Sequence, residues 1–260
     1  MISSATSPDY TGITETPGTL ITREAESMAV SRYEIARRRA QGKRVLEVAC
    51  GSGQGLGYVR RSAAWVVGGD ITPGLLTTAQ RHYQGLVPLV RFDAHALPFG
   101  DASFDMVQIH EALYYMSNHD RVLQECRRLL RPAGVLIISS INPQWADFNP
   151  SPHAVGYLDA EALKKLLTRH FADVELTGGF PVPRPTVASI IISILKRTAV
   201  RFQLIPRTMS GKTMLKRIFL GPLRPVPADL ALASAPVDEP SAVRPQEWSR
   251  YRVIYAIAQA

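Results

Sequence analysis

The chain has 260 residues, which is long enough for one complete α/β domain with an added segment and short for two full domains. Its apolar fraction of 46% and charged fraction of 20% are ordinary for a globular protein and exclude disorder over the whole length. The net charge of +8 is local, because basic and acidic residues balance over residues 1–180 and nearly all of the excess lies in residues 181–245.

The cysteine content favours a reducing compartment. Cys50 and Cys126 are too few and too far apart for a disulfide framework, so we expect two reduced thiols in a cytoplasmic protein. The first residues lack a basic stretch followed by an apolar one, and no signal peptide is expected. The most apolar stretch, residues 187–195, falls short of the roughly 20 residues that cross a bilayer.

Short apolar runs alternate with segments of helical spacing along the chain. A polar arm and a helix over residues 22–40 come first. The expected strands are residues 44–50, 65–71, 86–93, 104–110, 134–140, 173–177 and 248–259, and the expected helices are residues 72–83, 118–130 and 159–171. Near-continuous apolar runs are typical of strands that are buried on both faces of a parallel sheet.

This alternation of strands and helices predicts an α/β fold with a Rossmann-like, doubly wound sheet of seven strands. The last strand is expected to run antiparallel, after an insertion that precedes it. The predicted divisions are an N-terminal arm and helix (1–40), a ligand-binding core (41–180), a basic helical insertion or lid (181–245) and the final strand of the core (246–260).

A glycine-rich turn, CGSGQG at residues 50–55, ends the first strand. Glycines at such a turn let the backbone approach a ligand closely, and ligands of open α/β sheets bind at the carboxyl ends of the strands. A dinucleotide-binding turn needs a third glycine where this chain has Leu56, and a P-loop needs a lysine followed by serine or threonine. The remaining pattern is G-x-G-x-G, with Glu47 four positions before Gly51.

Residues 47–55 resemble motif I of class I S-adenosylmethionine-dependent methyltransferases. Further similar motifs follow in the family's order: an aspartate ending the second strand, an Asp-Ala pair after the third, LPFGDASFD at residues 97–105, and ECRRLLRPAG at residues 125–134. The resemblance covers residues 42–180. It implies S-adenosyl-L-methionine as the cofactor and a small-molecule methyltransferase, similar to bacterial enzymes that modify sugars, lipids or secondary metabolites.

The resemblance also implies roles for individual residues. Asp70 would hydrogen-bond the ribose hydroxyls, because a carboxylate can accept from two hydroxyls at once. Asp93 would meet the adenine amino group, and the amide of Ala94 would meet a ring nitrogen. The predicted cofactor-binding residues are Glu47, Gly51, Ser52, Gly53, Asp70, Ile71, Asp93, Ala94 and His110.

One position departs from the family's pattern. After the fourth strand many relatives carry a glutamate followed four positions later by a histidine, whereas here Glu111 is followed by Tyr115. A role of that histidine is therefore not carried over. Tyr115 either positions an acceptor through its hydroxyl or serves only in packing.

His153 and Glu111 are the predicted catalytic residues. A hydroxyl acceptor needs a base, histidine titrates near neutral pH, and His153 lies in the loop after the fifth strand. The alternatives are an exposed loop position for His153 and orientation of the cofactor or acceptor for Glu111. The histidines show no close metal-ligand spacing, so no metal is predicted.

The expected reaction is methyl transfer to a small-molecule acceptor, at a hydroxyl of a sugar, a lipid-linked sugar or a secondary metabolite. The alternatives are C- or N-methylation of a lipid or quinone precursor, and a non-catalytic regulator that binds S-adenosylmethionine. The basic segment is interpreted as a lid, as a contact with the inner face of an anionic membrane, or as recognition of an acidic acceptor. No nucleic-acid partner is predicted, because no recognition module is present.

Overall fold

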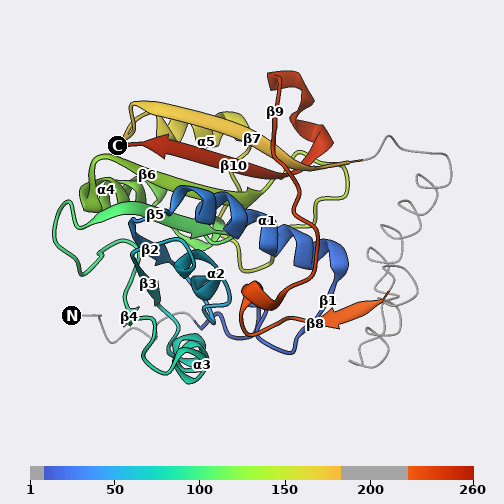
Figure 1. Ribbon diagram of the computed structural model, residues 1–260. Coiled ribbons are helices and arrows are strands. Elements are labelled where there is room, and N and C mark those ends of the chain that lie inside the picture. Colours follow the sequence, from blue (N-terminus) through green and yellow to red (C-terminus); the bar gives the residue numbers. More distant parts are fainter. Residues whose placement is uncertain (1–8, 183–221) are drawn as a thin grey trace.

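The computed structural model describes residues 9–182 and 222–260, which are coloured in Figure 1. An eight-stranded sheet with the order β4-β3-β2-β5-β6-β10-β7-β9 forms its centre. The strands are β2 (Arg44–Val48), β3 (Trp65–Asp70), β4 (Leu89–Arg91), β5 (Phe104–His110), β6 (Leu130–Ile141), β7 (Asp173–Pro181), β9 (Ser241–Ala242) and β10 (Tyr251–Gln259).

The predicted doubly wound α/β fold is confirmed. Strands β2 to β6 pair in parallel, whereas β10 lies between β6 and β7 and is antiparallel to both. The sheet has eight strands rather than seven, because the two residues of β9 pair with the edge of β7.

Helices cover both faces of the sheet. They are α1 (Arg23–Arg39), α2 (Leu56–Arg60), α3 (Pro73–Tyr83), α4 (His119–Leu129) and α5 (Ala160–Leu167), with 3₁₀ turns at Leu113–Tyr115 (η1), Leu230–Leu232 (η2) and Pro245–Arg250 (η3). Helices α1, α2 and α3 pack on one face, and α4 and α5 on the other. Along β6, Ile137 faces the first group while Leu136 and Ile138 face the second, as the alternation of a strand requires.

Three of the helices begin at residues that cap them. The side chains of Thr22, Asn118 and Asp159 accept hydrogen bonds from backbone amides in the first turns of α1, α4 and α5. Thr72, at the start of α3, makes no such bond, and its amide instead donates to Asp70 (2.8 Å). That contact joins the start of α3 to the end of β3.

Helix α1 is held by a segment that is distant in the sequence. A small second sheet pairs β1 (Leu20–Thr22) with β8 (Leu223–Pro225), and residues 226–239 then run along α1 (Figure 1). The hydroxyl of Ser27 donates to the carbonyl of Pro236 (2.5 Å), and Ser31 accepts from the amide of Asp238 (2.8 Å). The rest of the predicted basic insertion, residues 183–221, lies outside the described residues. Within the described ranges, no helix is long and apolar enough to cross a membrane.

Candidate active site

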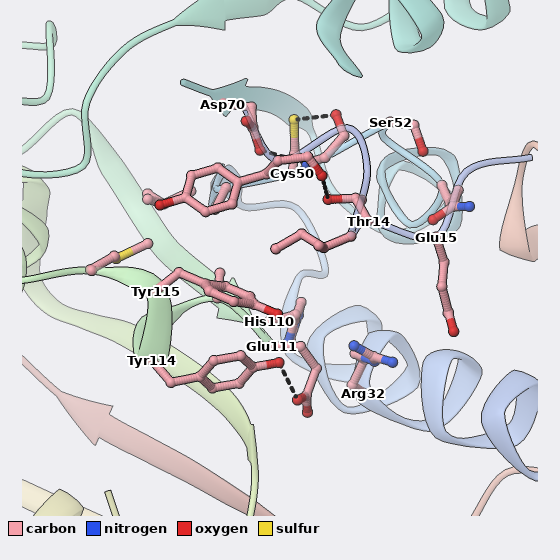
Figure 2. Close-up of a pocket in the computed structure, with 18 of the residues that line it drawn as sticks. Thr14, Glu15, Arg32, Cys50, Ser52, Asp70, His110, Glu111, Tyr114 and Tyr115 are labelled. Atoms are coloured by element: carbon pink, nitrogen blue, oxygen red, sulfur yellow. Dashed lines mark hydrogen bonds between the residues drawn. The ribbon is translucent and has the colours of Figure 1, made fainter. Parts of the chain in front are cut away.

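A cavity of about 740 Å³ opens at the carboxyl ends of β2, β3 and β5, as the glycine-rich turn predicts (Figure 2). Its volume is in the range of small-molecule sites, roughly 300–1,000 Å³. The lining also includes residues of α1, residues 10 and 13–15, and Val226 and Leu230. Residues from both ends of the chain therefore complete the pocket.

Two groups of residues line this pocket, and in Figure 2 Cys50 and Asp70 of the first lie opposite Glu111 and Tyr114 of the second. We call them the Asp70 wall (Cys50, Gly51, Ser52, Asp70, Ile71, Asp93 and Ala94) and the Glu111 wall (Glu111, Tyr114, Tyr115, Met116, Ile141, Val155 and Val253). Of the predicted cofactor-binding residues, those in the Asp70 wall and His110 line the pocket, whereas Glu47 and Gly53 are absent from its lining.

At the glycine turn, the backbone itself forms part of the Asp70 wall. Gly51 and Gly53 have φ angles of +57° and +77°, which glycine adopts at little cost. The Oγ of Ser52 and the Nε2 of Gln54 are buried without a hydrogen-bond partner in the described structure, and both residues line the pocket. Each unsatisfied polar atom costs about 1–3 kcal/mol, so this wall fits a ligand with polar groups.

The Asp70 carboxylate is buried and held by the backbone. Its Oδ2 accepts from the amide of Gly51 (2.9 Å) and its Oδ1 from the amide of Thr72 (2.8 Å). Each oxygen keeps a lone pair for a ligand hydroxyl. Two backbone bonds thus fix the carboxylate at the place where the sequence resemblance puts the ribose of the cofactor.

Asp93 is also fixed before any ligand binds. Its Oδ1 accepts from the amide of His95 (2.9 Å) and contacts the His95 Nδ1 (2.6 Å). Partial burial raises the pKa of Asp93. The two hydrogen bonds from His95 lower it by more than burial raises it, so the pKa of Asp93 lies below its usual value. The carboxylate is therefore an ionised acceptor at neutral pH.

Glu47 lies beneath the pocket rather than in it. Its Oε1 accepts from the hydroxyl of Tyr33 (2.5 Å) and its Oε2 from the Nε2 of Gln108 (2.8 Å). Burial raises the pKa of Glu47 to about 7, against the opposing effect of these hydrogen bonds. Glu47 therefore ties α1 and β5 to β2 below the glycine turn, and a direct contact with the cofactor stays a prediction.

His110 ends β5 as a neutral imidazole. Burial, followed by the positive charge of Arg32, lowers the pKa of His110 to about 3. Its Nδ1 lies 2.9 Å from the Oγ of Ser139, while its Nε2 is buried without a partner in the described structure. His110 can exchange a hydrogen bond with a ligand, but it cannot hold a proton near neutral pH.

Glu111 points into the pocket from a strained backbone. Its φ of +51° lies in the left-handed region, which costs a non-glycine residue of order 1 kcal/mol or more. Its Oε2 accepts from the hydroxyl of Tyr114 (3.2 Å) and from the amide of Ile141 (3.1 Å). These two bonds hold the carboxylate at the wall opposite Asp70 (Figure 2).

Aromatic and aliphatic groups make up most of the Glu111 wall. The ring of Tyr115 lies 4.6 Å from that of Tyr114 and 5.4 Å from that of Tyr10, measured between centroids. Tyr114 stacks in turn on Tyr157 at 4.5 Å. Tyr115, at the position where the family pattern has histidine, is thus packed between two tyrosine rings with one side toward the pocket.

His153 lies outside the pocket. Its side chain is exposed, and its backbone amide donates to the Oγ of Ser151 (3.3 Å). The residue is not part of the pocket lining, although its neighbour Val155 is. Glu111, in contrast, lines the pocket, and the catalytic roles of both residues stay predictions.

Sequence reasoning missed Arg32, which lines the pocket from α1. Its Nε donates to the carbonyl of Met28 (3.2 Å). A signal for it does exist, because the pocket-facing positions Ala25, Met28, Ala29, Arg32 and Tyr33 follow helical spacing. An arginine within such a stripe is expected to face the pocket, whereas an arginine elsewhere on the helix is expected to face solvent.

Comparison with known proteins agrees with this geometry. Residues 46–138 match the family model of a methyltransferase domain. The chain is 40% identical over 120 residues to phthiotriol/phenolphthiotriol dimycocerosates methyltransferase 1 of Mycobacterium ulcerans, covering 43% of this chain and 44% of that protein. It is 34% identical over 177 residues to the fatty-acid O-methyltransferase of Mycolicibacterium smegmatis, covering 64% and 63%.

The fold is shared with solved structures of the same class. An S-adenosylmethionine-dependent methyltransferase from Archaeoglobus fulgidus superposes with a TM-score of 0.55 at 19% identity, over 92% of this chain and 95% of that one. Residues 46–138 thus carry a methyltransferase domain, within a fold shared with S-adenosylmethionine-dependent methyltransferases, and this domain and fold imply S-adenosyl-L-methionine as the cofactor. It spans less than two thirds of the length of the curated relatives named above, at 44% and 63%.

Proposed function

We propose that the protein transfers a methyl group from S-adenosyl-L-methionine to a hydroxyl of an apolar, lipid-type acceptor. The observation that carries this proposal is the division of one pocket into the Asp70 wall, which offers polar groups for the cofactor, and the Glu111 wall, which is mostly apolar and holds one carboxylate. Two of the curated relatives are named for substrates of this kind, a fatty acid in one case and phthiotriol dimycocerosates in the other.

On the Asp70 wall, we assign the ribose hydroxyls to Asp70 and the adenine to Asp93, Ala94 and Ile71. The methionine part would follow Gly51 and Ser52 toward His110. The cofactor supplies a methyl group that is already activated on a sulfonium. The contribution of the chain is to hold donor and acceptor in line, and positioning of this kind lowers a barrier by about 7–11 kcal/mol.

On the Glu111 wall, the lining favours an alkyl chain or a ring over a free sugar. Tyr114, Tyr115, Met116, Val155 and Val253 offer few hydrogen bonds to a polyol. Burying hydroxyls there without partners would cost about 1–3 kcal/mol each. A sugar carried on a lipid remains compatible only if the lipid part contacts this wall.

Glu111 is the proposed proton acceptor. As the acceptor oxygen bonds to the methyl carbon and the carbon–sulfur bond breaks, the hydroxyl proton passes to Glu111. The hydrogen bonds from Tyr114 and Ile141 occupy Oε2, and Oε1 accepts none from the described residues. Glu111→Gln should lower kcat by about 10²–10⁴-fold, because a positioned base contributes that much.

The same Glu111→Gln variant should leave the affinity for S-adenosylhomocysteine, measured by calorimetry, within about twofold. Tyr157→Phe removes a hydroxyl whose oxygen accepts from Ser151 outside this wall and serves as a control. An unchanged kcat in Glu111→Gln would remove Glu111 from the proton path.

Labelled methyl transfer tests the function as a whole. The protein is incubated with methyl-labelled S-adenosylmethionine and a bacterial metabolite extract, and the phases are then separated with organic solvent. We expect label in the organic phase, attached to oxygen by mass spectrometry and NMR. Label on carbon or nitrogen would favour the lipid or quinone precursor alternative. Cofactor binding without label in any product would favour a non-catalytic regulator.

A further inference from the structure

Arg32 presents an unusual charge to the pocket. It lies on the side of α1 that faces the sheet, within the otherwise uncharged stripe of Ala25, Met28, Ala29 and Tyr33. In Figure 2 its guanidinium lies beside Glu111, away from Asp70. A cation in this place is costly unless something pairs with it.

Within the described structure, Arg32 has no ion-pair partner. Its Nε is used by the carbonyl of Met28 (3.2 Å), and no carboxylate of the described residues lies within 4.0 Å of its side-chain nitrogens. Glu111 and Glu15 act on it only through their more distant charges. The two terminal nitrogens therefore remain available toward the cavity.

The neighbouring arginines of α1 behave differently. Arg37 pairs with Glu34 (2.7 Å), and Arg38 pairs with both Glu34 (2.9 Å) and Glu239 (2.7 Å). Carboxylates thus neutralise Arg37 and Arg38, whereas no carboxylate of the described residues pairs with Arg32, which lines the pocket. A ligand anion would supply the missing partner.

We propose that Arg32 holds a carboxylate of a molecule bound in this pocket. The planar guanidinium presents two parallel N–H donors, which match the two oxygens of a carboxylate. This inference rests on the proposed function, and it sharpens the acceptor class to an acidic lipid whose chain follows the Glu111 wall. The methionine carboxylate of the cofactor is the other source of the same chemistry, and binding measurements separate the two.

The test uses paired probes that differ only in the carboxylate. For the acceptor, the probes are a long-chain fatty acid and the primary alcohol of the same length. For the cofactor, they are S-adenosylhomocysteine and its decarboxylated analogue. Binding of all four is measured by calorimetry to the full chain and to Arg32→Gln, which removes the charge, and Arg32→Lys, which keeps it without the fork.

Arg39→Gln is a matched control. Arg39 also lies on α1 and also donates to the carbonyl four residues earlier, that of Ile35 (3.3 Å), but it is not part of the pocket lining. We expect no change in the four affinities for this variant. Circular dichroism of each variant shows whether α1 is retained.

In Arg32→Gln, affinity for the fatty acid should fall by about ten- to a hundredfold, with the alcohol changed less than twofold. The affinity of Arg32→Lys for the fatty acid should lie between those of Arg32→Gln and the unaltered protein. A selective loss for S-adenosylhomocysteine but not its decarboxylated analogue would assign the carboxylate to the cofactor. Equal effects on both members of each pair would overturn the proposal.

These measurements do not depend on turnover. If labelled methyl transfer occurs but both pairs are unaffected by Arg32→Gln, the inference fails while the proposed function stands. If no transfer occurs and the affinity for a carboxylate probe still depends on Arg32, the proposed function fails while the inference stands.

Discussion

Asp70 and Glu111 face each other across one pocket, and each is fixed by backbone amides or a tyrosine before a ligand arrives. Side chains that are already ordered lose little entropy when they bind, which favours accurate positioning. The family resemblance led to Asp70, and the position after the fourth strand led to Glu111. Only the fold shows that Asp70 and Glu111 lie on opposite walls of the pocket.

Replacing Asp70 by alanine should weaken binding of S-adenosylhomocysteine by about 1–3 kcal/mol, because the ribose hydroxyls lose a charged acceptor. Calorimetry measures this directly. Asp101→Ala is a suitable control, since Asp101 is exposed and pairs only with Arg128 (2.8 Å) on the surface. Equal affinity of Asp70→Ala and the unaltered protein would place the ribose elsewhere.

His110 should make stability depend on pH. Its pKa is 6.5 in a solvated chain and about 3 in the fold, so unfolding takes up a proton below pH 6.5. The stability contributed by the neutral imidazole is fully present above pH 6.5 and is lost as the pH falls toward 3. The steepest expected slope is about 1.4 kcal/mol per pH unit.

Urea unfolding of the unaltered protein and of His110→Asn, compared from pH 7 to pH 4, isolates this contribution. Glu47 has the opposite effect, because its raised pKa makes the protein lose stability as the pH rises from 4.5 to about 7. Both proteins contain Glu47, so its effect cancels when the free energies of unfolding of the two proteins are subtracted. Parallel pH profiles for the two proteins would show that His110 is hydrated rather than buried.

Most of the core elements follow from their residue patterns. The prediction for β5 matches the structure, and α1 lies one residue inside the expected range at each end. Strand β4 is shorter than expected, because pairing with β3 starts only after Pro88. Helix α2, with five residues, and β9, with two, are too short to leave a periodic pattern.

The packing of α1 on the glycine turn makes Gly55 intolerant of a side chain. A Cβ at this position would lie 1.9 Å from the Cε1 of Tyr33, whose hydroxyl holds Glu47. Gly55→Ala should therefore destabilise the protein by about 1–3 kcal/mol, since overpacking displaces the ring. Gly156→Ala meets no atom within 4 Å and is the matched control in thermal unfolding. Equal midpoints would contradict this packing.

The candidate site could be predicted from the sequence only in part, because some of its residues come from segments that are distant in the sequence. Residues at strand ends, such as Asp70 and Asp93, are set by local sequence and sheet order. Tyr10 lines the pocket because the N-terminal segment lies beside it, and no local motif marks that contact, whereas Arg32 is marked only by the helical spacing of its pocket-facing neighbours. The chemistry of histidine favours His153 as a base, but its side chain is exposed and is not part of the pocket lining.

For the molecule as a whole, the distribution of charge along the sequence favours a contact with an anionic membrane. The excess positive charge lies in residues 181–245 of the sequence. We expect the protein to sediment with anionic vesicles at low salt and to detach at high salt, because exposed charges are screened. Neutral vesicles are the control. Absence from the anionic pellet at low salt would contradict the predicted membrane contact.

A crystal structure with S-adenosylhomocysteine tests the central claim most directly, because the proposed function assigns donor and acceptor to opposite sides of one pocket. The account predicts the ribose on Asp70, the adenine at Asp93 and Ala94, and the sulfur turned toward an open Glu111 wall. A ribose bound away from Asp70, or a cofactor filling the Glu111 wall, would contradict it.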